Sequence, residues 1–200
     1  MKFTHLGHST IAIAAPEGTI VIDPGGFTDV SCLDGAAAVL LTHAHADHLD
    51  VELVRASGLP VWGTQEAIDA VGSGTVVRSG ETFDILGQEI RAIGGLHEVI
   101  HPDVPRPENV GYYIDGLLHP GDEYADCPWP VEVLLLPVAG PWVKGEHAVD
   151  YGRRIGARVT IPIHDAVLSE IGKNLTDNLF GTTLGVPGYR RLAAGETLEF

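Results

Sequence analysis

Apolar and polar residues alternate along residues 10–23, and a Pro-Glu-Gly triplet interrupts the alternation near its middle. Two alternating runs joined by turn-forming residues predict a β-hairpin with one buried face. Residues 110–122 repeat this pattern around an Asp-Gly turn. The two predicted hairpins end on Asp23 and Asp122, each next to glycine or proline. The two halves of the chain therefore begin with similar elements.

The similarity continues after the hairpins. In each half we expect, in the same order, a buried strand, a helix, a short strand and a Gly-Glu-Thr sequence at the start of a further strand. These segments are residues 38–42, 48–57, 60–62 and 80–85 in the first half, and 131–136, 146–156, 158–163 and 195–200 in the second. Matching elements in a fixed order predict an internal duplication.

Two β-rich halves with interspersed helices predict an α+β fold, with two mixed sheets face to face and helices outside. This is a four-layer αββα sandwich with pseudo-twofold symmetry. A helix predicted over 165–179 agrees with it, because Leu168, Ile171, Leu175 and Leu179 form an apolar stripe that could pack inward. No linker separates the halves, so we expect one domain over 1–200. Residues 97–109 contain three prolines and predict a surface loop, a candidate lid.

Composition narrows the class of protein. Apolar residues make up 44% and charged residues 20%, as in a folded globular domain. The formal charge of −15 repels nucleic acid. No stretch approaches the ~20 apolar residues of a membrane span, and the first residues show no signal-peptide pattern. We therefore expect a cytoplasmic protein with reduced cysteines that acts on a small molecule. Its oligomeric state is open.

The run His43-Ala44-His45-Ala46-Asp47-His48 carries the clearest chemistry. Imidazole and carboxylate groups are good ligands for divalent metals. The run follows a predicted buried strand, so His43 and His45 point to the same side of an extended backbone. Asp47 and His48 follow after the chain bends and can face a second position. One loop can therefore supply two adjacent metals, which a solvated His-rich turn would not explain.

Further ligands are expected where other strands end, because strand ends bring distant residues to one edge. His97, Asp122 and His164 each lie just beyond a predicted strand. Other histidines are weaker candidates: His5, His101, His119 and His147.

In this order the residues form a signature that resembles the metallo-β-lactamase superfamily: the His43–His48 run, His97, Gly121-Asp122 and His164. The resemblance covers essentially the whole chain. Gly7-His8-Ser9, Ile22-Asp23-Pro24 and Ile161-Pro162-Ile163-His164 look most like a small bacterial branch related to ascorbate-6-phosphate lactonase. It implies that His43, His45 and His97 bind one metal, that Asp47, His48 and His164 bind the other, and that Asp122 bridges them.

The resemblance also implies hydrolysis. Two adjacent metals can share a water, lower its pKa and polarise the substrate oxygen. Zinc is expected from the His-rich ligands, with Mn or Fe also compatible. Asp47 and His164 are the candidate catalytic residues. The expected substrate is small and ester-like: a lactone, a thioester or a phosphodiester. The alternatives are a metal- or ligand-binding sensor domain without turnover, and a metal-dependent nuclease, which the charge disfavours.

Five further residues have two interpretations each. Asp23 either accepts hydrogen bonds from the histidine-rich loop or only shapes a turn. His8 is either a structural histidine or part of the metal rim. His101 either protonates a leaving group or is a solvated loop residue. Trp142 either walls a pocket or packs under its loop, and Lys144 either pairs with an anionic substrate or lies in water.

Overall fold

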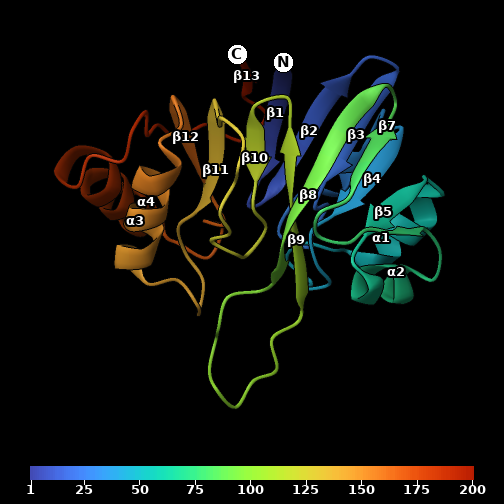
Figure 1. Ribbon diagram of the computed structural model, residues 1–200, viewed down its shortest axis with the longest axis horizontal. Coiled ribbons are helices and arrows are strands. Elements are labelled where there is room, and N and C mark those ends of the chain that lie inside the picture. Colours follow the sequence, from blue (N-terminus) through green and yellow to red (C-terminus); the bar gives the residue numbers. More distant parts are fainter.

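Both predicted hairpins form, and each belongs to a different β-sheet of the computed structural model, which describes residues 1–200 (Figure 1). The first sheet has seven strands in the order β13-β1-β2-β3-β4-β5-β6. The second has six, in the order β12-β11-β10-β9-β8-β7. Antiparallel hairpins and parallel neighbours occur in both sheets, so both are mixed.

The strands of the first sheet are β1 (Lys2–Gly7), β2 (Thr10–Ala15), β3 (Gly18–Ile22), β4 (Ala38–Leu41), β5 (Val61–Gly63), β6 (Thr75–Val76) and β13 (Thr197–Glu199). Those of the second are β7 (Thr82–Ile85), β8 (Gln88–Leu96), β9 (Glu108–Ile114), β10 (Leu117–His119), β11 (Val133–Pro137) and β12 (Val159–Ile163). The helices are α1 (Val51–Ser57), α2 (Gln65–Val71), α3 (Gly145–Ile155) and α4 (Glu170–Asp177), with short helical segments η1 (Val30–Leu33) and η2 (Asn178–Thr183).

Three apolar clusters define the layers. The largest, with 22 buried residues, lies between the two sheets and takes side chains from both. The second packs α3 against the outer face of the second sheet, and the third packs α1 and α2 against the outer face of the first. Figure 1 shows these helices on opposite sides of the paired sheets. The predicted αββα sandwich is confirmed.

The helix predicted over 165–179 is only partly correct. Ser169 caps a shorter helix, α4, by accepting a hydrogen bond from the backbone N of Gly172, and a π-helical segment, η2, continues the chain. The predicted inward packing of its apolar stripe is wrong, because Ile171 is 82% exposed and Leu175 is 69% exposed. The helix follows β12, an edge strand of the second sheet. Phe180 of η2 is the side chain that packs into the core there.

The carboxyl ends of β1, β3, β4, β8, β10 and β12 meet at one edge of the sandwich. Within each sheet these strands run in the same direction, because each pair is either parallel or separated by one antiparallel strand. Hydrogen bonds join the sheets here. Among them, Tyr112 Oη donates to the Leu41 carbonyl at 2.6 Å, and Val110 N donates to the Thr42 carbonyl at 2.9 Å. The long loop between β8 and β9 extends from this edge in Figure 1. None of the helices is long and apolar enough to cross a membrane.

Candidate metal centre

The predicted ligands gather at this edge in two adjacent groups. His43, His45, His97 and Asp122 form one group, and His8, Asp47, His48 and His164 form the other. In each group one ligand-type atom per residue lies within 4.8 Å of the others. Every residue in the two groups follows the carboxyl end of a strand or belongs to the loop after β4. Strand direction therefore brings the histidine-rich run after β4 together with four residues that are distant in the sequence.

Asp122 lies between the two groups. Its Oδ2 is 3.2 Å from His97 Nε2 and 3.1 Å from His164 Nε2, and its Oδ1 is 3.2 Å from His48 Nε2. Two ligands bound 2.0–2.1 Å from one tetrahedral ion lie about 3.3 Å from each other. The separations in the structure match this spacing, so one carboxylate can reach both positions.

Several buried polar atoms of these residues have no hydrogen-bond partner. They include His43 Nε2, His97 Nε2, His164 Nε2 and Asp122 Oδ1. Burying a polar atom without a partner costs roughly 1–3 kcal/mol, and such atoms are rare in folded proteins. Because these atoms face one another across short distances, bound cations would satisfy them together. The donor set of imidazoles and carboxylates suits divalent ions such as zinc.

Hydrogen bonds behind the histidines fix which ring nitrogen faces the centre. His97 Nδ1 donates to the Glu98 carbonyl at 2.6 Å, so its Nε2 carries no proton in the neutral ring. His48 Nδ1 donates to Asp23 Oδ2 at 2.7 Å, with the same consequence. Asp23 also accepts from the backbone N and the hydroxyl of Thr42, both at 2.7 Å. Asp23 thus joins the end of β3 to the beginning of the histidine-rich loop.

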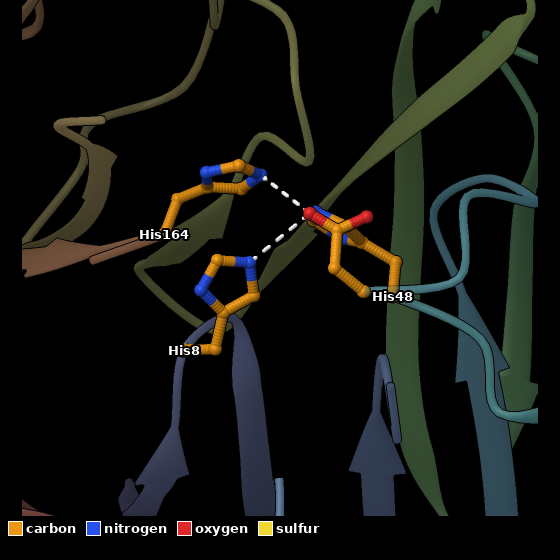
Figure 2. Close-up of side chains that lie close together, drawn as sticks. His8, His48 and His164 are labelled. Atoms are coloured by element: carbon orange, nitrogen blue, oxygen red, sulfur yellow. Dashed lines mark hydrogen bonds and ion pairs between the residues drawn. The ribbon is translucent and has the colours of Figure 1, made fainter. Parts of the chain in front are cut away.

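Asp47 is held from two sides. His8 Nε2 and His164 Nε2 each lie 3.2 Å from Asp47 Oδ2, and dashed lines in Figure 2 mark these two interactions. The backbone N of Ala166 donates to His8 Nδ1 at 3.3 Å, so Nε2 of neutral His8 bears the proton. His8 therefore donates to Asp47 and orients this carboxylate, although its position is also within reach of an ion.

The site concentrates negative charge in a buried place. Burial raises the pKa of Asp122, but His48 and His164 outweigh this effect and hold the pKa well below its usual range. Burial lowers the pKa of His48, but the charges of Asp122 and Asp23 hold it well above the usual value. Burial also lowers the pKa of His164, but Asp122 and Asp47 outweigh this effect and raise the pKa to about 9. The carboxylates thus attract positive charge, which protons or metal ions can supply.

At His43, burial is the dominant influence on the pKa. It holds the pKa of this histidine well below the usual value, and the nearby charge of His48 adds to the shift. The neutral imidazole is the form that binds a metal. Burial also outweighs the hydrogen bond to Asp47 at His8, whose pKa is lowered.

The remaining predicted residues divide into one near the site and two away from it. Trp142 is buried, and its Nε1 donates to Asp122 Oδ2 at 3.1 Å. His101 lies on the β8–β9 loop, is largely exposed and has Asp103 as its charged neighbour. Lys144 is also largely exposed and pairs with Glu146. Its charge is already matched by that carboxylate.

Two residues that support Asp122 were not among the predicted site residues: Asn109 was not considered, and His119 was named only as a weaker ligand candidate. Asn109 Oδ1 accepts from the backbone N of Asp122 at 3.0 Å. His119 Nδ1 accepts from Gly121 N at 3.2 Å, and its Nε2 donates to the Ser9 carbonyl of the other sheet at 2.8 Å. The position of His119 at the end of a hairpin strand was the only signal for it. Asn109 gave none, because the turn that it supports is thirteen residues away.

Comparison with known proteins agrees with the geometry. A family model described as a beta-lactamase superfamily domain matches residues 2–164. This chain belongs to the metallo-β-lactamase superfamily.

Among curated proteins, the chain is 32% identical to Protein Rv0786c of Mycobacterium tuberculosis, over 84% of this chain and 86% of that protein. It is 29% identical to a UPF0173 metal-dependent hydrolase of Methanoculleus marisnigri, over 88% of this chain and 86% of that protein. Two solved structures share the fold. Igni18, a metallo hydrolase from Ignicoccus hospitalis, has a TM-score of 0.73 at 21% identity, covering 100% of this chain and 98% of that chain. YhfI from Bacillus subtilis, a metallo-beta-lactamase fold protein, has a TM-score of 0.74 at 15% identity, covering 98% of each chain.

Proposed function

We propose that this protein is a metal-dependent hydrolase that binds two divalent ions and cleaves a small ester-like substrate. The observation that carries the proposal is the set of buried, unpartnered ligand atoms of His43, His97, His164 and Asp122. Hydrolases are among its relatives: the protein of Methanoculleus marisnigri is a metal-dependent hydrolase by name. Zinc is the ion that we expect from this donor set, with Mn²⁺ and Fe²⁺ as alternatives.

The candidate ligands have distinct tasks in this proposal. One ion would be held by His43, His45 and His97. The other ion would be held by Asp47, His48 and His164, and Asp122 would contact both ions. Bound divalent ions would supply an activated water and polarise the oxygen that gains negative charge. Asp47 lies at the open side of the site, with its side chain 21% exposed. It can orient the attacking water and pass a proton to the leaving group.

Three neighbouring residues keep these groups in place. His8 donates a hydrogen bond to Asp47 Oδ2, so this carboxylate keeps one orientation while its other oxygen stays available. Asp23 accepts from His48 Nδ1, so Nε2 of His48 faces the ion. Trp142 donates to Asp122 Oδ2 and shields this carboxylate from water. Contacts of this kind commonly change metal affinity 10- to 100-fold when they are removed.

The net charge of the protein limits the range of possible substrates. A chain with a net charge of −15 repels nucleic acid, so we expect a small molecule. The likeness to ascorbate-6-phosphate lactonase makes lactones the first class to test, beside thioesters and bis-aryl phosphodiesters.

The decisive experiment is a substrate screen with protein loaded with Zn²⁺ or Mn²⁺. We expect turnover of at least one small ester class, reduced about 100-fold or more in His45→Ala, which removes a candidate ligand. Val30→Ala, at an exposed position outside the site, controls for handling and contaminants. Binding of two metals without turnover of any class would favour a sensor domain. His45-dependent cleavage of RNA or DNA alone would favour a nuclease.

A further inference from the structure

A pocket of about 500 Å³ opens directly beside Asp47 and His164. Its volume lies in the range of ordinary small-molecule sites. Asp47 and His164 are its only polar side chains. The other side chains that line it are apolar: Phe27, Ala46, Ala139, Pro141, Val167 and Leu168.

The walls come from loops that are distant in sequence. Phe27 lies between β3 and η1, Pro141 between β11 and α3, and Val167 and Leu168 between β12 and α4. The Phe27 ring stands edge-on to the His8 ring, with 5.1 Å between the centroids. One wall of the pocket therefore packs against His8, the residue that orients Asp47.

Large apolar side chains remain in water at its rim. Phe27 is 54% exposed and Val167 is 55% exposed. Single exposed apolar residues are common, but two of them that line one concave pocket beside a reactive centre indicate a ligand. A ligand with an apolar part would remove this surface from water.

Away from Asp47 and His164, where the proposed metal would lie, the pocket has no source of positive charge. No lysine or arginine lines it. Lys144, on the neighbouring loop, is paired with Glu146. Arg191, which contacts Asp165 just after His164, is also bound by Asp177. A phosphate or carboxylate in the apolar part of this pocket, away from the proposed metal position, would have no lysine or arginine to pair with.

We propose that this pocket binds a neutral apolar acyl group of the substrate, next to the bond that is cleaved. The inference rests on the proposed hydrolase function and names its substrate class: esters, thioesters or lactones whose acyl part is an uncharged alkyl chain. Burying one methylene group in such a pocket tightens binding about two- to fourfold. Binding affinity should therefore increase steadily with the length of the alkyl chain.

The first test measures binding without turnover. Zinc-loaded protein is titrated calorimetrically with 2-hexanone, 2-octanone and 2-decanone, neutral compounds that cannot be hydrolysed. We expect the Kd to fall two- to fourfold per methylene group until the pocket is filled. In Val167→Arg the Kd for 2-decanone should rise about tenfold or more. Val30→Arg makes the same change at an exposed valine outside the pocket and should leave the Kd unchanged. Equal Kd values for the three ketones, or unchanged binding in Val167→Arg, would overturn the proposal.

The second test uses 4-nitrophenyl esters. We expect kcat/KM to rise from acetate to octanoate, and the pentanoate ester to exceed the hemisuccinate ester, which is similar in length and carries a negative charge, about tenfold or more. A preference for the hemisuccinate ester, or no dependence on chain length, would refute the apolar pocket and leave the hydrolase function intact. Chain-length-dependent ketone binding without any ester turnover would support the pocket and contradict the hydrolase function.

Discussion

Replacing Asp23 by asparagine tests whether the hydrogen bonds behind His48 control the second metal position. The Asp23 carboxylate is fully buried and accepts from Thr42 N, Thr42 Oγ1 and His48 Nδ1, all at 2.7 Å. An asparagine can still accept from Thr42 N, but its amide NH₂ then faces His48 Nδ1. To avoid two opposed donors, His48 must carry its proton on Nε2, and this nitrogen is then unable to bind an ion.

The size of the effect follows from these contacts. Loss of a charged hydrogen bond to a buried histidine costs about 1.5–3 kcal/mol. Loss of a group that orients a metal ligand weakens metal binding about 10- to 100-fold, which corresponds to about 1.4–2.8 kcal/mol. We therefore expect Asp23→Asn to retain the metal of His43, His45 and His97 and to bind the other at least tenfold more weakly.

The assay is competition with a chromophoric chelator, combined with elemental analysis after dialysis. Asp50→Asn is the matched control, because Asp50 lies two residues after His48 and caps α1 through Leu53 N, a task that asparagine performs equally well. Circular dichroism and urea unfolding of both variants establish that they are folded. Two metals bound to folded Asp23→Asn with wild-type affinity would refute the reasoning.

Three further predictions use the same protein. Asp47→Ala should lose one metal and Asp122→Ala should weaken both, as measured by elemental analysis; equal losses would contradict a bridging position for Asp122. Saturation with metal at about 100 times its Kd should add about 2.7 kcal/mol per site, or about 5–10 °C in Tm, measured by calorimetry with and without chelator; an unchanged Tm would argue against metal binding to the folded state. Burial, with a contribution from Asp29, raises the pKa of Cys32 to about 11, so its alkylation at pH 8 should be roughly 100-fold slower in the folded protein than in urea; similar rates in the two states would contradict the burial of this thiol.

The sequence was sufficient to predict the sandwich and to select the residues that gather at its edge. Alternation located the hairpins and apolar runs located β4 and β11, because both signals depend on local periodicity. The position of His97 and His164 just after strands was informative because strand direction decides which ends meet. These features need no knowledge of distant contacts.

Features that depend on packing between distant segments were not predictable. The stripe of Ile171 and Leu175 has helical spacing, but spacing does not reveal whether anything packs against it, and both side chains are exposed. His8 was ambiguous because its task depends on Ala166 N, which is 158 residues away. Lys144 had two interpretations; its partner Glu146 is only two residues away, so this contact is local rather than distant.

The two similar hairpins end on aspartates that have different hydrogen-bond partners. Asp23 and Asp122 end equivalent hairpins, β2–β3 and β9–β10, and both carboxylates contact His48. Asp23 accepts from Nδ1 at 2.7 Å, whereas Asp122 Oδ1 is 3.2 Å from Nε2. His48 thus lies between the two halves. Asp23 fixes the proton on its Nδ1, and Asp122 lies next to its Nε2. Asp23 has its oxygens occupied by Thr42 and His48, whereas Asp122 Oδ1 lacks a hydrogen-bond partner. This difference in hydrogen bonding, rather than a difference in residue type, leaves Asp122 free to bind a metal in our proposal and commits Asp23 to holding His48.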